Sequence, residues 1–286
     1  GSTVRVWRRD NGSTASSIDV GAAWVHSVAF NPDGTVLAIA VDRSRGDLES
    51  ASGPEIGLVR FVDPHTGRDV GDPISYDNGP PISLGWSRDG RLLAAATADN
   101  FLHIYDGRTR RPVVANIENV DAPHLDVAFS NDGTRVVTGT GGGAVRQWDA
   151  RTGKEIPPAL EGQVGDVAGV AYSADGRMLA TTAFGLSTTR LWEVPAGRVI
   201  GADLVGGRVP YTTRTVSFEH FARSRPAFAP DGRHLATVGA DGAAELWDLA
   251  PDDWLQAACA VAGRDLTDAE WREHLPARHP FALCPR

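Results

Sequence analysis

Short apolar segments alternate with turn residues along the chain, in a pattern that repeats five times. Each repeat holds an apolar segment, an Asp-Gly pair and a second apolar segment. The pairs are Asp33-Gly34, Asp89-Gly90, Asp132-Gly133, Asp175-Gly176 and Asp231-Gly232. Glycine adopts a positive φ without a Cβ clash, and aspartate hydrogen-bonds the nearby backbone, so each pair predicts a β-hairpin.

The same pattern predicts four strands in each unit. First strands are expected at 25–30, 82–86, 125–129, 167–172 and 226–228, and second strands at 36–41, 92–97, 136–140, 178–183 and 235–238. Third strands end in an aromatic-acid pair or a relative of it: Val62-Asp63, Tyr105-Asp106, Trp148-Asp149, Trp192-Glu193 and Trp247-Asp248. A fourth strand follows a turn such as 149–154. The first strands are almost wholly apolar, which indicates burial on both faces, whereas third strands such as 145–148 alternate and predict one polar side.

The spacing of the units predicts the architecture. The glycines of successive Asp-Gly pairs are 56, 43, 43 and 56 residues apart. Four short strands in about 43 residues is the period of a β-propeller blade. A β-sandwich of unrelated hairpins is the alternative, but sandwiches lack a fixed long period. We therefore predict an all-β fold of radially arranged, four-stranded sheets.

The units resemble WD (tryptophan-aspartate) repeats, most clearly at 128–133 and 147–149. The resemblance covers about residues 3–249 and implies a WD-repeat β-propeller with structural roles for Trp7, Tyr105, Trp148, Trp192 and Trp247. The family often has a buried His bonded to Ser/Thr and Asp. Here Gln163 stands at the histidine position, Asp99 and Asp241 fall at aspartate positions, and no unit has the full set. These departures imply that the blades depend more on apolar packing than on a buried polar network.

The N-terminal segment departs from the repeat. Residues 3–7 have the pattern of a third strand and 16–20 that of a fourth, without a first and second strand of their own. Either the chain is the C-terminal part of a larger propeller, about seven blades by analogy with the family, or 16–20 closes a five-blade ring on the last unit. We favour the larger propeller because 3–7 has the full repeat pattern. In both cases residues 1–249 form the propeller domain.

Two long steps between units locate insertions at about 43–56 and 205–223. Both connections emerge on the same face of a propeller of this kind, so they are expected to decorate one rim. Long loops on a rigid scaffold are frequent binding sites. The predicted partner-binding residues are Arg43, Arg45, Arg208, Tyr211, Arg214, Phe218, His220 and Phe221, a mixture of arginine and aromatic groups suited to a protein contact. Alternatively, the aromatic side chains pack back on the blades.

Residues 250–286 predict a helical tail packed on the propeller. A first helix is expected up to about Ala262, and Thr267 with Glu270 form a capping box at the start of a second, with Trp271 in a hydrophobic staple. This tail resembles the segment that follows WD repeats in large bacterial signalling ATPases of the STAND/NACHT-like type. The resemblance implies a C-terminal sensor region, with a nucleotide-binding module further upstream in the polypeptide.

Composition and motif searches argue against several other functions. Against 28 Lys+Arg stand 36 Asp+Glu, a net charge of −8 that disfavours binding to nucleic acid or anionic membranes. Neither a Gly-x-x-x-x-Gly-Lys-Ser/Thr loop nor a Gly-x-Ser-x-Gly elbow occurs. Cys259, His274, His279 and Cys284 do not have the spacing of a zinc finger, and two cysteines fit a reducing cytosol. No cofactor, metal or catalytic residue is predicted.

The sequence thus predicts a non-catalytic, cytoplasmic WD-repeat module that binds protein or peptide partners and acts as the regulatory sensor or scaffold of a bacterial signalling protein. An upstream nucleotide-binding module of the same polypeptide is one such partner. A propeller-based enzyme and a free-standing scaffold protein are the alternatives.

Overall fold

A computed structural model describes residues 2–21, 23–43, 56–118, 122–184, 188–194, 196–205, 225–238 and 244–249. Every regular element among them is a β-strand, and the strands form six separate antiparallel sheets. No helix that could span a membrane occurs in these ranges. The tail at 250–286 and most of the two insertions lie outside them.

The six sheets follow one another along the chain. The N-terminal pair consists of β1 (Thr3–Trp7) and β2 (Thr14–Asp19). Unit 1 consists of β3 (Trp24–Phe30), β4 (Leu37–Asp42), β5 (Gly57–Val62) and β6 (Ile74–Tyr76), and unit 2 of β7 (Pro81–Trp86), β8 (Leu92–Thr97), β9 (Phe101–Asp106) and β10 (Pro112–Glu118). Unit 3 consists of β11 (His124–Phe129), β12 (Arg135–Thr140) and β13 (Val145–Asp149). Unit 4 consists of β14 (Val167–Tyr172), β15 (Met178–Ala183), β16 (Thr188–Glu193), β17 (Arg198–Val199) and β18 (Leu204–Val205), and unit 5 of β19 (Ala227–Phe228), β20 (His234–Val238) and β21 (Ala244–Asp248).

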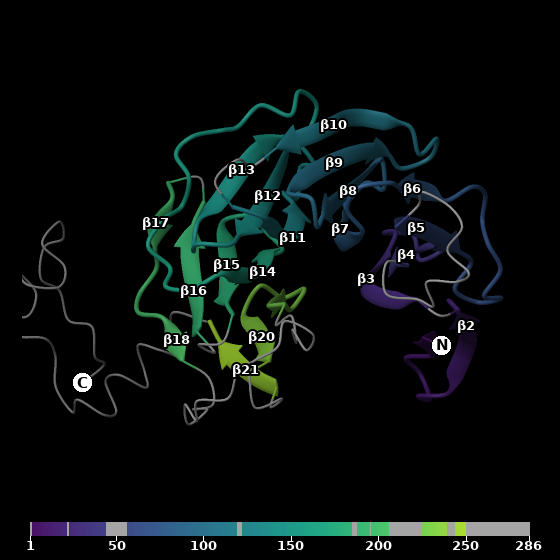
Figure 1. Cartoon of the computed structure of the whole chain (residues 1–286). Coiled ribbons are helices and arrows are strands. Elements are labelled where there is room, and N and C mark those ends of the chain that lie inside the picture. The colour runs from purple at the N-terminus through teal and green to yellow at the C-terminus, as the bar shows by residue number, and fades with distance from the viewer. Residues whose placement is uncertain are drawn as a thin grey trace, which may run out of the picture.

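The sheets are arranged radially along an arc, as Figure 1 shows. The first strand of each unit is innermost, and β3, β7, β11, β14 and β19 contact one another in that order. Within each unit the strands pair in chain order, from the centre outward. This arrangement confirms the expected WD-repeat-like, all-β propeller architecture and excludes two facing layers of sheet for the described strands.

The Asp-Gly turns have the predicted chemistry. In unit 3, Gly133 has a φ of 68°, and Asp132 Oδ1 accepts hydrogen bonds from the Thr134 amide at 3.0 Å and from Ser130 Oγ at 2.6 Å. These bonds hold the pKa of the Asp132 carboxyl below its usual value, chiefly through the Ser130 hydroxyl. The turn therefore depends on an ionised aspartate and on a backbone conformation that suits glycine.

Apolar side chains fill the junctions between neighbouring units. Between units 1 and 2, small residues of β4, Ala38 and Ala40, lie against Leu84 of β7, with Phe61 of β5 in the same cluster. Between units 3 and 4 the backbones also approach closely, because a Cβ at Gly139 of β12 would overlap the carbonyl oxygen of Val167 in β14. The core thus lies between the sheets, as the radial arrangement requires.

Two details differ from the sequence prediction. In place of a regular fourth strand, unit 3 has two isolated bridges, Val145 with Leu160 and Trp148 with Glu155. The predicted polar side of β13 is also wrong, because Gln147 and Trp148 are both buried. Unit 3 has neighbours on each side, so both faces of its third strand are covered.

The N-terminal pair lies on unit 1. Among the described strands, β2 pairs with β1 and not with β21, so residues 16–20 do not close a ring on the last unit. Ile18 of β2 packs with Leu37 and Ile39 of β4 in one apolar cluster, on the side of unit 1 that faces away from unit 2. The pair therefore takes the place of a preceding blade.

Candidate functional site

The innermost strands present one equivalent position each to the centre of the arc. It lies three residues before the aromatic residue that ends the first strand. Ser27, Ser83, Asp126 and Gly169 occupy it in units 1 to 4, and Arg225, two residues before β19, occupies it in unit 5. Because the repeat places these positions side by side, polar groups at them can interact between units. We call Ser27, Ser83, Asp126 and Arg225 the central network.

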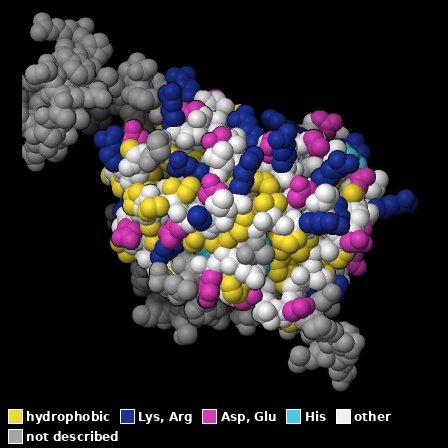
Figure 2. All heavy atoms as spheres, turned by 90° about the horizontal axis from the view of Figure 1, so that it is seen from above, with side chains coloured by type: hydrophobic (Ala, Val, Ile, Leu, Met, Phe, Trp, Pro, Cys, Tyr) yellow, Lys and Arg dark blue, Asp and Glu magenta, His cyan; other side chains and the backbone are white. Residues whose placement is uncertain are grey.

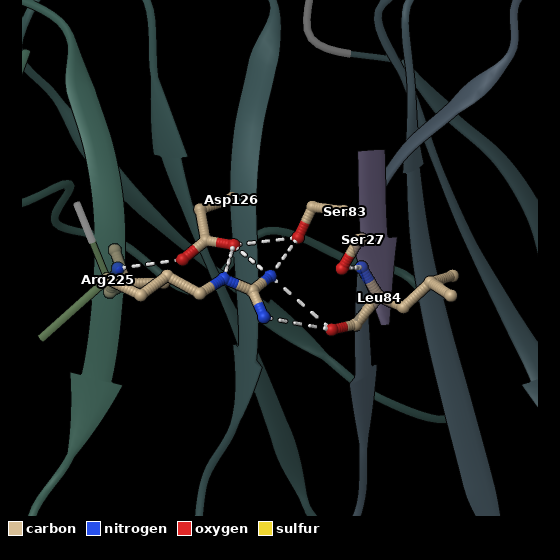
Figure 3. A network of polar contacts seen from close by, with 6 residues as sticks. Ser27, Ser83, Leu84, Asp126 and Arg225 are labelled. Atoms are coloured by element: carbon tan, nitrogen blue, oxygen red, sulfur yellow. Dashed lines mark hydrogen bonds and ion pairs between the residues drawn. The ribbon is translucent and has the colours of Figure 1, made fainter. Parts of the chain in front are cut away.

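Neighbouring units are hydrogen-bonded through this network (Figure 3). The Leu84 amide of unit 2 donates to Ser27 Oγ of unit 1 at 3.2 Å. Ser83 Oγ donates to Asp126 Oδ1 of unit 3 at 2.7 Å, and the Val170 amide of unit 4 donates to Asp126 Oδ2 at 3.0 Å. A side chain at this position thus bonds the next unit at each junction from unit 1 to unit 4.

Arg225 of unit 5 extends the network across the arc. Its Nε donates to Asp126 Oδ1 at 2.8 Å, and its Nη2 contacts the same oxygen, Ser83 Oγ and the Leu84 carbonyl (Figure 3). The Asp126 side chain is fully buried, and that of Arg225 is 37% exposed. A buried carboxylate needs such a partner, because an unpaired charge is costly away from water.

The chemistry of the central network is architectural. Both oxygens of Asp126 are engaged by donors from three other units, and the Ser83 hydroxyl donates to a carboxylate that Arg225 already neutralises. A nucleophilic serine needs a neighbouring base that is free to take its proton, and Asp126 does not have that freedom. Among the residues that the structure describes, no group of three metal-ligating side chains converges.

A second polar arrangement anchors the third-strand tryptophans. Trp148, Trp192 and Trp247 donate from Nε1 to Thr138, Thr181 and Thr237 at 3.0, 2.9 and 2.8 Å. Gln163, at the position where the family often has histidine, is buried and hydrogen-bonded to Thr181 Oγ1. The blades were expected to depend more on apolar packing than on a buried polar network, but in unit 4 part of such a network is present, since the Gln163 amide oxygen accepts a hydrogen bond from the Thr181 hydroxyl.

The other residues predicted to be structural lie in different environments. Tyr105 is buried between units 1 and 2, whereas Trp7 is 60% exposed. Asp99 is half-buried, and its Oδ1 is shielded without a hydrogen-bond partner among the described residues. Asp241, Thr267, Glu270 and Trp271 lie outside the described ranges.

One of the predicted rim residues is described. Arg43 is exposed directly after β4, and its amide donates to the carbonyl of Ile56 before β5 at 2.8 Å, at the base of the first insertion. The insertions fall where expected in the chain, between β4 and β5 and between β18 and β19. The remaining predicted partner-binding residues, Arg45, Arg208, Tyr211, Arg214, Phe218, His220 and Phe221, lie outside the described residues.

Sequence reasoning missed Asp126 and Arg225. The signal was present in the alignment of the units, because a column otherwise occupied by serine and glycine holds one acid and one arginine. Opposite charges at equivalent positions of two units indicate a contact across the centre, but only once the positions are known to be innermost.

Comparison with known families agrees with this geometry. Three segments match the family model of the WD domain, G-beta repeat, at residues 75–106, 122–149 and 224–248. The chain carries WD repeats. The WD segments contain the Trp148–Thr138 and Trp247–Thr237 bonds and include the units that contribute Ser83, Asp126 and Arg225. No curated protein matches the chain. WD-repeat proteins are typically non-enzymatic interaction modules, and the WD segments support that general role here.

Proposed function

We propose that the chain is a non-catalytic WD-repeat module that binds protein partners through loops at the rim of its arc. The proposal rests on one observation: the polar groups at the centre of the arc bond one unit to another. Asp126, which is the wholly buried carboxylate of the network, holds units together through Ser83, Val170 and Arg225. The scaffold is thereby rigid at its centre, and long loops on rigid scaffolds are where binding residues concentrate.

The described surface supports a protein partner. Figure 2 shows a face on which apolar side chains gather in the middle, with basic (Lys or Arg) and acidic side chains around them. Such a mixture of exposed apolar and arginine groups is characteristic of protein interfaces. The proposed rim residues have the same chemistry: Arg43, Arg45, Arg208, Tyr211, Arg214, Phe218, His220 and Phe221.

We further propose that the module is the C-terminal sensor of a larger, cytoplasmic bacterial signalling protein. The support is the resemblance of residues 254–271 to the segment that follows WD repeats in bacterial signalling ATPases. The rim would bind a ligand, or an upstream nucleotide-binding module of the same polypeptide, more tightly in one state than in the other. Only such a difference in affinity shifts the equilibrium between two states. The coding sequence ahead of Gly1 tests this context: a nucleotide-binding module supports it, and a stop codon contradicts it.

Capture experiments test the rim. The full chain is immobilised, and proteins bound from a bacterial extract are quantified by mass spectrometry and then confirmed with purified partner. The rim variant carries Arg208→Glu and Arg214→Glu, and the matched control carries Arg8→Glu and Arg9→Glu in the exposed turn between β1 and β2. We expect the rim variant alone to lose its partner by roughly tenfold or more, as charge reversal at an interface does. Equal capture by both variants contradicts the rim proposal.

A further inference from the structure

The two ends of the sheets differ in charge. Because neighbouring strands are antiparallel, the turns after first and third strands lie at one end of each sheet, and the connections after second and fourth strands lie at the other. In units 2 to 4 the turns at the first end hold ten Lys and Arg residues and six acids, at 87–91, 106–111, 130–135, 149–154, 173–177, 193–194 and 196–198. At the other end, four acids and neither Lys nor Arg occur at 77–80, 98–100, 141–144 and 161–166. In Figure 2 most Lys and Arg side chains lie in the upper half of the view.

Hydrogen bonds and close packing join the basic turns into one surface. In unit 2 the Gly107 amide donates to the Arg91 carbonyl at 2.6 Å, which ties the outer turn to the inner one, and equivalent bonds of 2.9 and 2.7 Å occur in units 3 and 4. Between units, Asn131 Nδ2 donates to the Ala174 carbonyl at 2.7 Å. The outer turn of unit 3 lies against β10 of unit 2, because a Cβ at Gly153 would approach a β10 side chain to 2.5 Å.

Six basic side chains of this surface are exposed. We call them the basic face: Arg91, Arg108, Arg111, Arg151, Lys154 and Arg177. The Arg91 side chain is 83% exposed, and its ion pair with Asp89 is 3.6 Å long. Arg110, in contrast, lies over the Phe61 ring at 4.2 Å and donates to the Asp72 carbonyl at 3.0 Å. The fold therefore uses Arg110 for packing between units 1 and 2, and leaves the basic face in contact with solvent.

The aspartates between these basic residues are bonded within their own turns. Asp106 Oδ1 accepts from the Thr109 amide at 2.6 Å, and Asp149 Oδ1 accepts from the Thr152 amide at 2.8 Å. These amide bonds are the main reason why the pKa of both carboxyls lies below its usual value. Because the turn fixes each carboxylate beside the backbone, the longer basic side chains extend past it and can meet anions from outside.

We propose that the basic face is a docking surface for an acidic segment of a partner protein. The planar guanidinium of arginine binds a carboxylate through two parallel hydrogen bonds. Val113, which is 44% exposed and lies two residues after Arg111, offers an apolar contact to side chains between the acids. A long phosphate chain fits less well, because it has no apolar side chains and the net charge of −8 repels it.

This surface is separate from the proposed rim. The insertions leave the sheets between β4 and β5 and between β18 and β19, which is the end opposite the basic face. A partner can therefore dock on the basic face whether or not the rim is occupied.

A peptide titration tests the proposal. The probe is a fluorescein-labelled peptide of repeated Glu-Glu-Leu, and its control has glutamine in place of glutamate. Binding to the full chain is measured by fluorescence anisotropy at low and at physiological salt. We expect the glutamate peptide alone to bind, with an affinity that falls by about fivefold or more as salt screens the exposed charges.

Charge-reversal variants locate the binding. Arg111→Glu and Lys154→Glu should each weaken binding by about fivefold, because repulsion replaces an attraction between exposed charges. Arg111→Lys keeps the charge and should retain more of the affinity than Arg111→Glu. The matched control is Arg5→Glu, which makes the same substitution at an exposed position in the middle of β1 and should leave binding unchanged. Thermal unfolding of each variant checks that it is folded.

Several results would overturn the proposal. Failure of the glutamate peptide to bind excludes an acidic ligand, and equal binding of the glutamine peptide shows that carboxylates are not recognised. Equal loss in Arg5→Glu assigns the effect to net charge. Tighter binding of linear polyphosphate at the same residues assigns the face to phosphate groups, and salt-sensitive self-association that Arg111→Glu abolishes assigns it to a second copy. None of these results bears on partner capture by the rim.

Discussion

At the scale of single residues, polar side chains in this protein are tied to particular partners in the fold. Thr181 accepts from Trp192 and donates to Gln163, so one hydroxyl connects the third strand to the segment ahead of the first. The turn aspartates act in the same local way, each bonding an amide two residues further along, as Asp33 does with Thr35 at 2.9 Å. A buried polar group is stable only when it is paired, which explains why these residue types recur at fixed positions.

Buried His124 gives the protein a pH dependence. Its ring is fully buried in β11, edge-on to Trp148 with the ring centroids 5.6 Å apart. Burial lowers the pKa of His124 to about 4. In the unfolded chain the His124 ring takes up a proton near pH 6.5. The contribution of neutral His124 to the free energy of unfolding is therefore complete above pH 6.5 and falls as the pH drops from 6.5 towards 4. The slope expected from one such group is about 1.4 kcal/mol per pH unit.

His124→Phe tests this prediction. Phenylalanine keeps an aromatic ring against Trp148 and removes the titrating group. Urea unfolding at pH 7, 6 and 5 should show a shallower loss of stability in this variant, whereas His65→Phe, at an exposed turn position, should keep the slope of the parent. A slope unchanged by His124→Phe would show that other groups cause the pH dependence.

At the scale of elements, the repeat made most strands predictable. The Asp-Gly turns and aromatic ends placed β7, β8, β9 and their equivalents because turn chemistry and side-chain alternation are local properties of the chain. The irregular fourth strand of unit 3 was not predictable, because an edge strand is held by few backbone bonds and has a weak pattern. The burial of Gln147 depended on the neighbouring unit, which local pattern does not reveal.

At Gly139, the packing of two neighbouring strands requires a residue without a side chain, and this requirement can be tested directly. Strand β12 approaches β14 so closely at this residue that a Cβ would overlap the Val167 carbonyl oxygen. Gly139→Ala should destabilise the protein by about 2 kcal/mol or more, because backbone must move to relieve the overlap. Gly133→Ala is the matched control: its Cβ would meet nothing closer than Ser87 at 3.7 Å, so only the positive φ of 68° opposes it. That cost is about 1 kcal/mol.

Urea unfolding of the two glycine variants separates crowding from backbone conformation. The difference should also appear as faster hydrogen exchange in β12 and β14 of Gly139→Ala. If Gly133→Ala is the more destabilised variant, units 3 and 4 do not need the close approach seen here.

At the scale of the whole molecule, charged residues far apart in sequence connect the units. Arg225 and Asp126 are 99 residues apart, and their contact joins the last unit to the third. The sequence predicted radial sheets, because each unit needs apolar neighbours on both faces. It did not predict this bond, because nothing local to either residue requires the other.

The Arg225–Asp126 contact should stabilise unit 5 more than the rest of the arc. Arg225→Met leaves the buried Asp126 carboxylate with Ser83 and Val170 as its remaining donors among the described residues. Loss of one partner of a buried pair costs about 3–5 kcal/mol, and the partial exposure of Arg225 puts this case near the lower end. Hydrogen exchange should therefore quicken most in β19–β21, and Asp126→Asn in the same chain should restore part of the loss by removing the stranded charge. The coupling energy from the double-mutant cycle measures the bond across the arc, and additive effects of the two substitutions would mean that the pair does not hold unit 5 in place.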